Sequence, residues 1–414
     1  MMLPRWAQNL LDKHPGAALP TAEAPIPAWL EEEARKKPLW YIIRESDVVR
    51  EQHPFVVYDE IVKEPTQWGE ILATKRAEID VLARELVQRG IRRIIFTGCG
   101  SAFFTAIHGG LLFRRFTNLS TDVIESYELV HYFPRVDAAT TAVIAHSGTG
   151  GSIETVEAIR AAKARNVLTV ALSNTEVSPV LDEADRAVVY VTRQHCGPCI
   201  SVISTRILMQ TMLASALASS ADDQRLLERE VSVLPEAGHA FLQDFTGRVE
   251  DFARRTVDVE SAFLVGSGPN YFSAREGTLK IEEQSLTVGK AYRTGDFHHD
   301  ALSLLSPARL VVAIAAEGAA NRRIVDVLRA AKEGLSPTLA VEYGDVGGLA
   351  PYANETWHLS GAVGEYVAPV LLTLPFQLLG YFMGVARGRN PDTLATERLS
   401  NARAWLTAFP LGTH

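Results

Sequence analysis

The chain has 414 residues, of which 47% are hydrophobic and 22% charged, and its formal net charge is -8. This length is enough for two or three domains with full cores, and the composition is that of an ordinary globular protein. The negative charge disfavours nucleic acid or an anionic membrane as the main partner, because both attract a basic surface.

The N-terminal residues lack the charged start, apolar centre and cleavage site of a secretory signal, so a cytoplasmic location is expected. Three cysteines are too few for a disulfide scaffold. Cys196 and Cys199 have the spacing of a redox dithiol, but the pattern of a thioredoxin domain is missing around them. One such pair also offers too few ligands for a metal. The sequence therefore predicts neither a metal site nor a cofactor.

Residues 1–65 are rich in Pro, Glu and Lys and are expected to form an N-terminal arm laid over the body. From 66 to 90 apolar residues recur at helical spacing and the pattern ends at Gly90, which predicts a lead-in helix. Two domains are expected to follow, a first at 66–235 and a second at 236–392, with a C-terminal tail at 393–414.

Short apolar runs alternate with helical patterns through both domains. Strands connected by helices form parallel sheets with helices on both faces, so the sequence predicts an α/β fold with two five-stranded parallel sheets. The strands are expected at 93–97, 121–125, 141–145, 167–172 and 187–192, and again at 262–266, 288–292, 309–316, 337–342 and 355–359. Helices are expected at 101–116, 126–131, 152–165 and 178–182, with a helical connection at 203–260.

One uncharged run, 366–386, is long enough to cross a bilayer. It contains Pro369, Pro375 and Gln377, and no second run of this kind occurs in the sequence. We therefore expect a buried helix packed under a sheet, and no membrane partner.

Two loops rich in glycine and hydroxyl side chains follow the first and third strands, at 98–101 and 146–152. In parallel sheets, ligands bind beyond the carboxyl ends of the strands. Small residues let backbone N–H groups approach an anion, and the dipole of the next helix favours negative charge. The two loops together predict a site for a phosphate monoester. The alternative is an ordinary helix cap formed by Ser152 with Thr155.

The stretch 275–300 carries the predicted chemistry. Glu276, Lys280 and Glu283 have the i, i+4, i+7 spacing that brings three side chains onto one helix face, and His299 follows them. A carboxylate, an ammonium and an imidazole around one pocket can move a proton between adjacent carbons of a sugar. The alternative is a salt-bridged stripe on a solvated helix.

Five motifs, at 98–101, 147–155, 202–206, 276–283 and His299, together resemble the family of double SIS (sugar isomerase) domain phosphosugar isomerases. The resemblance covers about residues 60–392 and is strongest to the isomerase half of glucosamine-6-phosphate synthase. It implies two tandem SIS-type domains, the first binding phosphate and the second supplying Glu, Lys and His. It also implies a homodimer with a shared active site, because the histidine in this family often comes from the neighbouring subunit.

The resemblance assigns roles to individual residues. Glu283 is expected to shuttle the proton between C1 and C2, Lys280 to stabilise the enolate oxygen and His299 to open the sugar ring. Glu276 is expected to orient Lys280 or a hydroxyl. The expected phosphate-binding residues are Ser101, Ser147, Gly148, Ser152 and Thr155. The other residues expected at the substrate site are Cys99, Gly100, His146, Val202 and Ser204.

Two departures from the family pattern affect the expected activity. Met2 stands where a glutaminase would need a nucleophilic cysteine, so no glutaminase activity is expected. No lysine follows Lys332, whereas the synthase closes its site with one, so Arg398 or Arg403 could contact the substrate instead.

Three functions fit these residues. The first is aldose–ketose isomerisation of a hexose or aminohexose 6-phosphate, with or without deamination. The second is a fructosamine-6-phosphate deglycase, because the segment 296–299 resembles that of such enzymes. The third is a regulator that binds a sugar phosphate without turnover, although phosphate binding alone requires none of Glu283, Lys280 and His299.

Overall fold

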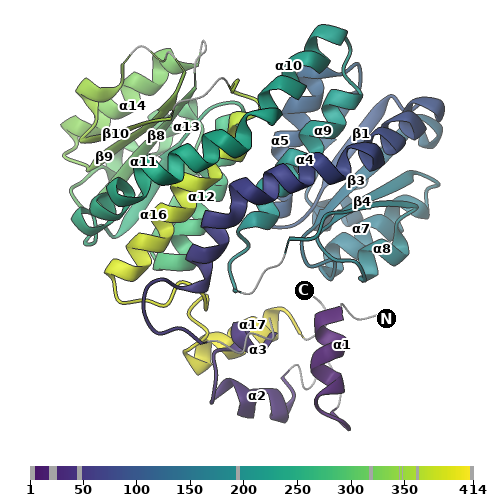
Figure 1. Cartoon of the computed structure of the whole chain (residues 1–414), viewed down its shortest axis with the longest axis horizontal. Coiled ribbons are helices and arrows are strands. Elements are labelled where there is room, and N and C mark those ends of the chain that lie inside the picture. The colour runs from purple at the N-terminus through teal and green to yellow at the C-terminus, as the bar shows by residue number, and fades with distance from the viewer. Residues whose placement is uncertain are drawn as a thin grey trace.

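The computed structural model of the chain describes residues 5–17, 26–43, 49–192, 196–316, 320–344, 346, 348–359 and 363–410. Two five-stranded sheets lie on either side of a central layer of long helices (Figure 1). Short helices from the two ends of the chain lie together beside this body (Figure 1).

The first sheet has the strand order β2-β1-β3-β4-β5, and all its pairings are parallel. Its strands are β1 (Arg93–Thr97), β2 (Ser120–Val123), β3 (Thr141–Ser147), β4 (Leu168–Ser173) and β5 (Arg186–Val189). The central strands β3 and β4 are buried along their whole length, which explains why they read as continuous apolar runs.

The second sheet has the order β10-β9-β8-β6-β7 and is also parallel throughout. Its strands are β6 (Ser261–Val265), β7 (Val288–Tyr292), β8 (Arg309–Ala316), β9 (Thr338–Tyr343) and β10 (Glu355–Leu359). Counted from its own first strand, each sheet follows the same order, 2-1-3-4-5. The predicted repetition of one α/β unit, and the expected position of every strand, are therefore confirmed apart from small shifts at the strand ends.

The turn after the first strand is repeated as well. Gly100 and Gly268 have φ angles of 54° and 56°, and each is the residue before a long helix. Both angles lie in the left-handed region, which glycine adopts without steric cost.

The helices cover both faces of each sheet, as predicted. They are α1 (Arg5–Asp12), α2 (Ala28–Ala34), α3 (Leu39–Ile43), α4 (Val56–Gln88), α5 (Ser101–Phe116), α6 (Ser126–His131), α7 (Ile153–Lys163), α8 (Pro179–Glu183), α9 (Ser201–Ala216), α10 (Ala221–Ser232), α11 (Leu234–Arg255), α12 (Pro269–Ser285), α13 (Thr294–Asp300), α14 (Asn321–Glu333), α15 (Ala368–Leu371), α16 (Thr373–Ala386) and α17 (Leu399–Ala408). α5 and α12 cover the inner faces of the two sheets, whereas α7 and α14 cover the outer faces.

The inner faces of both sheets share one hydrophobic core. Ile94 of β1 and Leu264 of β6 belong to the same apolar cluster, which also contains the central helices. Their neighbours Ile95 and Val265 point the other way, into separate clusters. This alternation is the period of two that a strand imposes. The two units therefore meet through a common layer of helices.

Two helices differ from the prediction. The lead-in helix α4 begins at Val56 rather than at 66, with Pro65 inside it. A proline in a helix interior removes one backbone hydrogen bond, and here Pro65 is buried against Gly238 of α11. The apolar segment expected under a sheet forms α15 and α16, which pack against α9, α11 and α12 instead.

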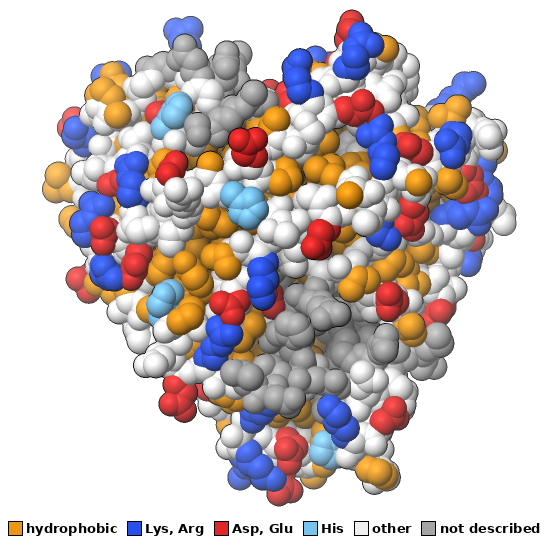
Figure 2. Space-filling view, viewed as in Figure 1, with side chains coloured by type: hydrophobic (Ala, Val, Ile, Leu, Met, Phe, Trp, Pro, Cys, Tyr) orange, Lys and Arg blue, Asp and Glu red, His pale blue; other side chains and the backbone are white. Residues whose placement is uncertain are grey.

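The buried position of this apolar segment is confirmed. Residues Ala368–Ala386 are the one helical stretch, among the described residues, that is long and apolar enough to span a bilayer, and this stretch is almost entirely buried inside the protein. Over the face drawn in Figure 2, acidic and basic side chains are interspersed without a large basic field.

The arm and the tail form one small helical cluster. Leu30, Leu39 and Trp40 of the arm pack with Ala402 and Leu406 of α17. Asp392 joins this cluster to the body, because its carboxylate accepts hydrogen bonds from the Tyr41 hydroxyl at 2.7 Å and from the backbone N–H groups of Val56 and Val57 at 3.0 and 2.8 Å. The same carboxylate thereby caps the start of α4.

Helices α12 and α16 cross with their backbones in close contact. A Cβ atom added at Gly380 would lie 2.6 Å from the carbonyl oxygen of Lys280, and one added at Gly384 would lie 2.3 Å from that of Gln284. Both distances are shorter than a carbon–oxygen contact allows. Glycine on α16 therefore sets the depth at which α12 is buried.

We predict that Gly380→Ala lowers the free energy of unfolding by about 1–3 kcal/mol, because the extra methyl group forces the two helices apart. Chemical denaturation measures the change. Gly247→Ala is the matched control, since Gly247 lies inside α11 with no atom within 4 Å of the added carbon. The control should gain about 0.5–1 kcal/mol through helix propensity. A Gly380→Ala variant as stable as the wild type would contradict the packing argument.

Candidate active site

A cavity of about 400 Å³ lies at the carboxyl edge of the first sheet. The loops after β1 and β3 form one wall, α12 and the loop before α9 form another, and the arm and tail form a third. Seven residues expected at the site line this cavity: Cys99, Gly100, Ser101, Ser147, Gly148, Ser152 and Glu283. The loop residues predicted to bind phosphate and the predicted base thus face the same space.

The strand order explains where the two loops meet. β1 and β3 are neighbours, and the sheet reverses its direction of growth between them. Connections leave such a pair of strands toward opposite faces, which opens a crevice at their carboxyl ends. The N-termini of α5 and α7 both begin at this crevice, and their dipoles favour an anion there.

The serine hydroxyls in the crevice differ in how they are held. Ser147 accepts a hydrogen bond from the backbone N–H of Gly150 at 3.0 Å, which folds the loop over the end of β3. Ser152 precedes α7, but its side chain makes no capping hydrogen bond. The alternative interpretation of Ser152 as an ordinary helix cap therefore does not describe this structure.

Thr155 lies below the crevice rather than on its wall. It is fully buried, and its hydroxyl contacts the hydroxyl of Ser126 at 3.2 Å and the sulfur of Cys99 at 3.7 Å. The Cys99 thiol donates to the Glu125 carboxylate at 3.2 Å. Burial, together with Glu125, raises the pKa of Cys99 to about 12, so the thiol stays protonated at neutral pH.

The three residues of α12 form a buried charged group. The Lys280 ammonium lies 2.5 Å from the Glu283 carboxylate and 3.4 Å from that of Glu276, and it donates to the carbonyl oxygen of Cys199 at 3.0 Å. The side chains of Lys280 and Glu276 are 0% and 3% exposed, which excludes the alternative of a solvated stripe. Glu283 alone of the three lines the cavity, with 19% of its side chain exposed.

Burial and charge act in opposite directions within this group. Burial disfavours the ammonium, but the carboxylates of Glu283 and Glu276 outweigh that effect and raise the pKa of Lys280. For Glu283, burial raises the pKa and the Lys280 ammonium offsets part of the rise. A carboxylate with a raised pKa is a stronger base than an exposed glutamate.

The segment with the two spaced cysteines is the support for Lys280. It lies between β5 and α9, and Cys196 is buried, with its thiol donating to Glu60 at 3.3 Å. Both cysteines are free thiols. The backbone N–H of Gly197 donates to the carbonyl of Asp392 at 2.8 Å, which connects this segment to the start of the tail.

Three further expected site residues do not line the cavity. His146 is fully buried, and burial, followed by the positive charge of Arg206, lowers its pKa well below the usual value, so it is neutral. Val202 is buried beside Gly148. Ser204 lies in the contact between α9 and α4, where it donates to Glu64 and accepts from the indole N–H of Trp68 at 2.9 Å.

His299 lies on α13, which packs on α14 and not on the cavity wall. The side chain is exposed to solvent. None of the described residues that line the cavity is a histidine. Within one chain, the expected imidazole and the expected base are therefore apart.

Several lining residues carry no sequence signal for a site. Trp40 of the arm and Leu394, Trp405 and Phe409 from the C-terminal part form an apolar wall. These residues are scattered at the two ends of the chain, so no local pattern groups them. Arg403, which was expected near the substrate, instead pairs with Glu31 at 2.5 Å, and neither it nor Arg398 lines the cavity. Arg206 lines the cavity and belongs to a motif that was recognised without a role for it.

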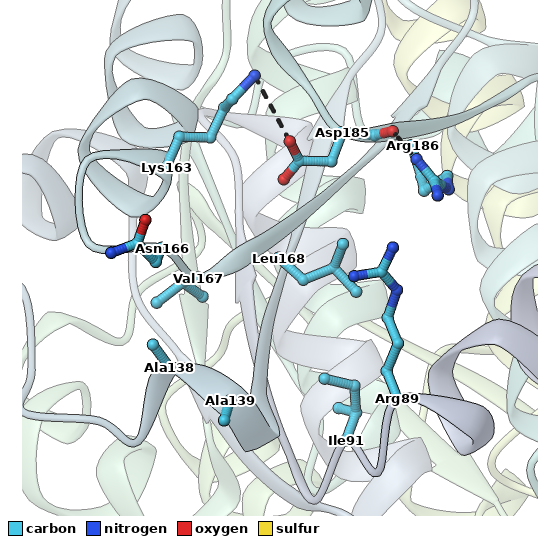
Figure 3. A pocket seen from close by; sticks show the side chains of 10 residues that line it. All are labelled: Arg89, Ile91, Ala138, Ala139, Lys163, Asn166, Val167, Leu168, Asp185 and Arg186. Atoms are coloured by element: carbon cyan, nitrogen blue, oxygen red, sulfur yellow. Dashed lines mark hydrogen bonds and ion pairs between the residues drawn. The ribbon is translucent and has the colours of Figure 1, made fainter.

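A second hollow, of about 610 Å³, lies at the opposite, amino edge of the same sheet. Figure 3 shows its lining, with Lys163 paired to Asp185 at 3.5 Å. Arg89 and Arg186 both pair with Glu85. Its cations are thus neutralised by carboxylates, and it lacks the glycine-rich loops and helix N-termini of the carboxyl edge.

The chain matches one protein-family model, described as "SIS domain", at residues 89–220 and 257–371. Over 328 residues it is 27% identical to the glutamine–fructose-6-phosphate aminotransferase (isomerizing) of Methanothermobacter thermautotrophicus, and this match covers 79% of the chain and 52% of the relative. The enzyme of the same description from Pyrococcus horikoshii is 29% identical over 306 residues, covering 72% and 50%. The chain therefore spans about half the length of the curated relatives it matches.

Solved structures resemble the fold at lower sequence identity. The C-terminal domain of glucosamine-fructose-6-phosphate aminotransferase from Francisella tularensis superposes with a TM-score of 0.74 at 19% identity, covering 83% of this chain and 100% of that one. The glucosamine-6-phosphate deaminase of Thermotoga maritima gives 0.61 at 21% identity, covering 81% and 96%. The tagatose-6-phosphate ketose/aldose isomerase of Escherichia coli gives 0.69 at 18% identity, covering 84% and 97%. These matches establish the fold.

Proposed function

Since this chain belongs to the SIS-domain family, we propose that it is a phosphosugar isomerase that interconverts the aldose and ketose forms of a hexose or aminohexose 6-phosphate. One observation carries the proposal: Glu283 and the hydroxyl-bearing residues Ser101, Ser147 and Ser152 line a single cavity. An anion held at one end of the cavity leaves the far end of a sugar phosphate beside a carboxylate. Proximity of this kind is the main requirement for proton transfer between adjacent carbons.

In the proposed reaction the serine loops bind the phosphate and orient the open-chain sugar. The Glu283 carboxylate removes the proton from one of the two carbons C1 and C2 and returns it to the other. The raised pKa of Glu283 supports this role, because it brings the base closer to the pKa of a carbon acid activated by a carbonyl.

Lys280 is proposed to act on Glu283 rather than on the substrate directly. Its ammonium is buried, donates hydrogen bonds to the Glu283 carboxylate and the Cys199 carbonyl, and is paired with the Glu276 carboxylate at 3.4 Å. This arrangement fixes the orientation of Glu283, and the ammonium offsets part of the rise in its pKa that burial causes. Glu276 in turn fixes Lys280. We therefore assign positioning roles to Lys280 and Glu276, in place of the enolate contact expected for Lys280.

His299 is proposed to complete the site of a partner subunit in a homodimer. Its exposure on α13 and the absence of histidine from the described cavity lining both support this assignment. There it would protonate the ring oxygen and assist ring opening.

A deglycase acting on a fructosamine 6-phosphate is the second candidate, and the apolar wall favours it. A free hexose 6-phosphate is polar over its whole length and gains little from contact with Trp40, Leu394, Trp405 and Phe409. The organic substituent on the amine of a fructosamine would bury apolar surface against them. Both candidates use the same base and the same enol intermediate.

A substrate screen tests the proposal and separates the two candidates. Hexose, aminohexose and fructosamine 6-phosphates are incubated with the protein, and aldose, ketose, ammonia and free amine are each measured. We expect turnover of at least one, reduced about 10²–10⁴-fold by Glu283→Gln with binding retained. Glu282→Gln is the control, because Glu282 lies on the same helix but accepts a hydrogen bond from Gly289. Binding without turnover in the wild type would instead favour a regulator.

The pH profile tests the coupling of Glu283 to Lys280. Only the ionised carboxylate is a base, so kcat should fall as the pH drops through the raised pKa of Glu283, above the value of about 4.3 for an exposed glutamate. Lys280→Met removes the cation that favours the ionised form, so the acid limb should move to higher pH by about one unit or more. Lys332→Met, on the exposed face of α14, should leave the limb in place. An unshifted limb in Lys280→Met would show that the ammonium does not act on Glu283.

Mixing two inactive variants tests the shared site. His299→Ala and Glu283→Gln each remove one essential group, but a heterodimer of the two has one site with both groups intact. After subunit exchange, about one quarter of wild-type activity should return. If His299 acted within its own chain, no mixture would regain activity.

A further inference from the structure

Arg206 is a buried cation on the cavity wall that none of the assigned roles uses. It lies on α9, and only 2% of its surface is exposed to solvent. Among the described residues that line the cavity, it is the one Lys or Arg. A guanidinium stays charged at all physiological pH values. A positive charge has therefore been taken out of water at this point.

The described residues satisfy this charge only in part. Nε donates to the Tyr190 hydroxyl at 2.8 Å, whereas Nη1 is buried without a hydrogen-bond partner in the described part of the chain. No ion pair involving Arg206 is found there either, in contrast to the buried Lys280, which has two carboxylates. The cations of the hollow at the amino edge also have carboxylate partners: Lys163 pairs with Asp185 (Figure 3), and Arg89 and Arg186 pair with Glu85.

A buried charge without a counter-ion is unfavourable, and proteins retain one where a ligand supplies the opposite charge. The neighbours of Arg206 indicate which ligand. A Cβ atom added at Gly148 would lie 3.0 Å from Nη2, so the guanidinium adjoins the loop of Ser147 and Ser152. The hydroxyls and backbone N–H groups of that loop can donate hydrogen bonds to an anion. The loop itself carries no positive charge, so Arg206 is the side chain that could supply one.

We propose that Arg206 is this cation, and that it binds the phosphate dianion of the substrate together with the serine loop. The inference rests on the proposed function and deepens it, because it makes the site selective for a phosphorylated sugar over a neutral one. The planar guanidinium can present two parallel N–H groups to two phosphate oxygens, and the hydrogen bond to Tyr190 holds its plane. Tyr190 is thus a positioning residue.

Calorimetric titration with inorganic phosphate tests the proposal without any substrate. Arg206→Met should raise the phosphate Kd by about 30-fold or more, because one partner of a buried charged contact is lost. Ser147→Ala should raise it by roughly 3- to 10-fold, as expected for one neutral hydrogen bond. Arg254→Met, which removes an exposed arginine on α11, is the control for the loss of one positive charge and should change nothing.

Thermal unfolding distinguishes an anion-binding arginine from a structural one. Without phosphate, Arg206→Met should melt at the same temperature as the wild type or higher, because an unpaired buried charge has been removed. With saturating phosphate, the Tm of the wild type should rise and that of the variant should not. A variant that melts lower in both conditions, with an unchanged phosphate Kd, would show that Arg206 is structural.

Arg206→Lys provides a second test should the methionine variant fail to fold. A lysine keeps the positive charge but loses the two parallel N–H groups of the guanidinium. Phosphate binding should therefore weaken, whereas the Tm without phosphate is retained. If phosphate binds Arg206→Lys as tightly as the wild type while Ser147→Ala weakens phosphate binding, the inference about Arg206 is wrong. The proposal that the serine loop binds phosphate would then still hold. If the wild type binds no phosphate, both the inference about Arg206 and the proposed phosphate site are wrong.

Discussion

The buried ammonium of Lys280 is the constraint around which the site is organised. A charge with 0% exposure is tolerated only where oxygens surround it, and here they come from Glu276, Glu283 and the carbonyl of Cys199. Two of these lie on α12 and the third lies in the loop before α9, so the ion group ties the second α/β unit to the first. The depth of α12 is set in turn by Gly380 of α16, which leaves no room for a side chain between the two backbones. The direction in which Glu283 faces follows from these contacts.

The end of the cavity proposed to bind the anion has an independent origin. Its position follows from the strand order, because the reversal between β1 and β3 places two loops and two helix N-termini at one edge of the sheet. The second sheet has the same order, yet its first turn leads into α12, which carries Glu276, Lys280 and Glu283 instead. Duplication of one unit thus gives two sheets with the same strand order, and differences in their side chains divide the proposed anion contacts and the proposed base between the two units.

The two ends of the chain contribute the remaining wall. Asp392 accepts hydrogen bonds from the arm and from the start of α4, and its own carbonyl accepts one from Gly197. The tail, the arm and the loop that supports Lys280 are therefore joined at one residue. This connection places Trp40 and Trp405, from opposite ends of the sequence, on the same cavity.

The sequence by itself determined the ten strands, their parallel arrangement, the duplication, the family, the glycine-rich loops and the face of α12, because these depend on local periodicity and spacing. It also indicated that 366–386 is buried, although not that helices rather than a sheet would cover it. Only the tertiary structure decided that Glu283 reaches the cavity while Lys280 and Glu276 lie behind it, that Ser204 belongs to a helix contact, and that His299 faces solvent. It also decided the position of Arg206 and of the aromatic wall. The physical reason is that the burial of a side chain and its nearest partner depend on residues that are distant in the sequence. The periodicity of a segment carries no information about which distant residues lie close to it in the fold.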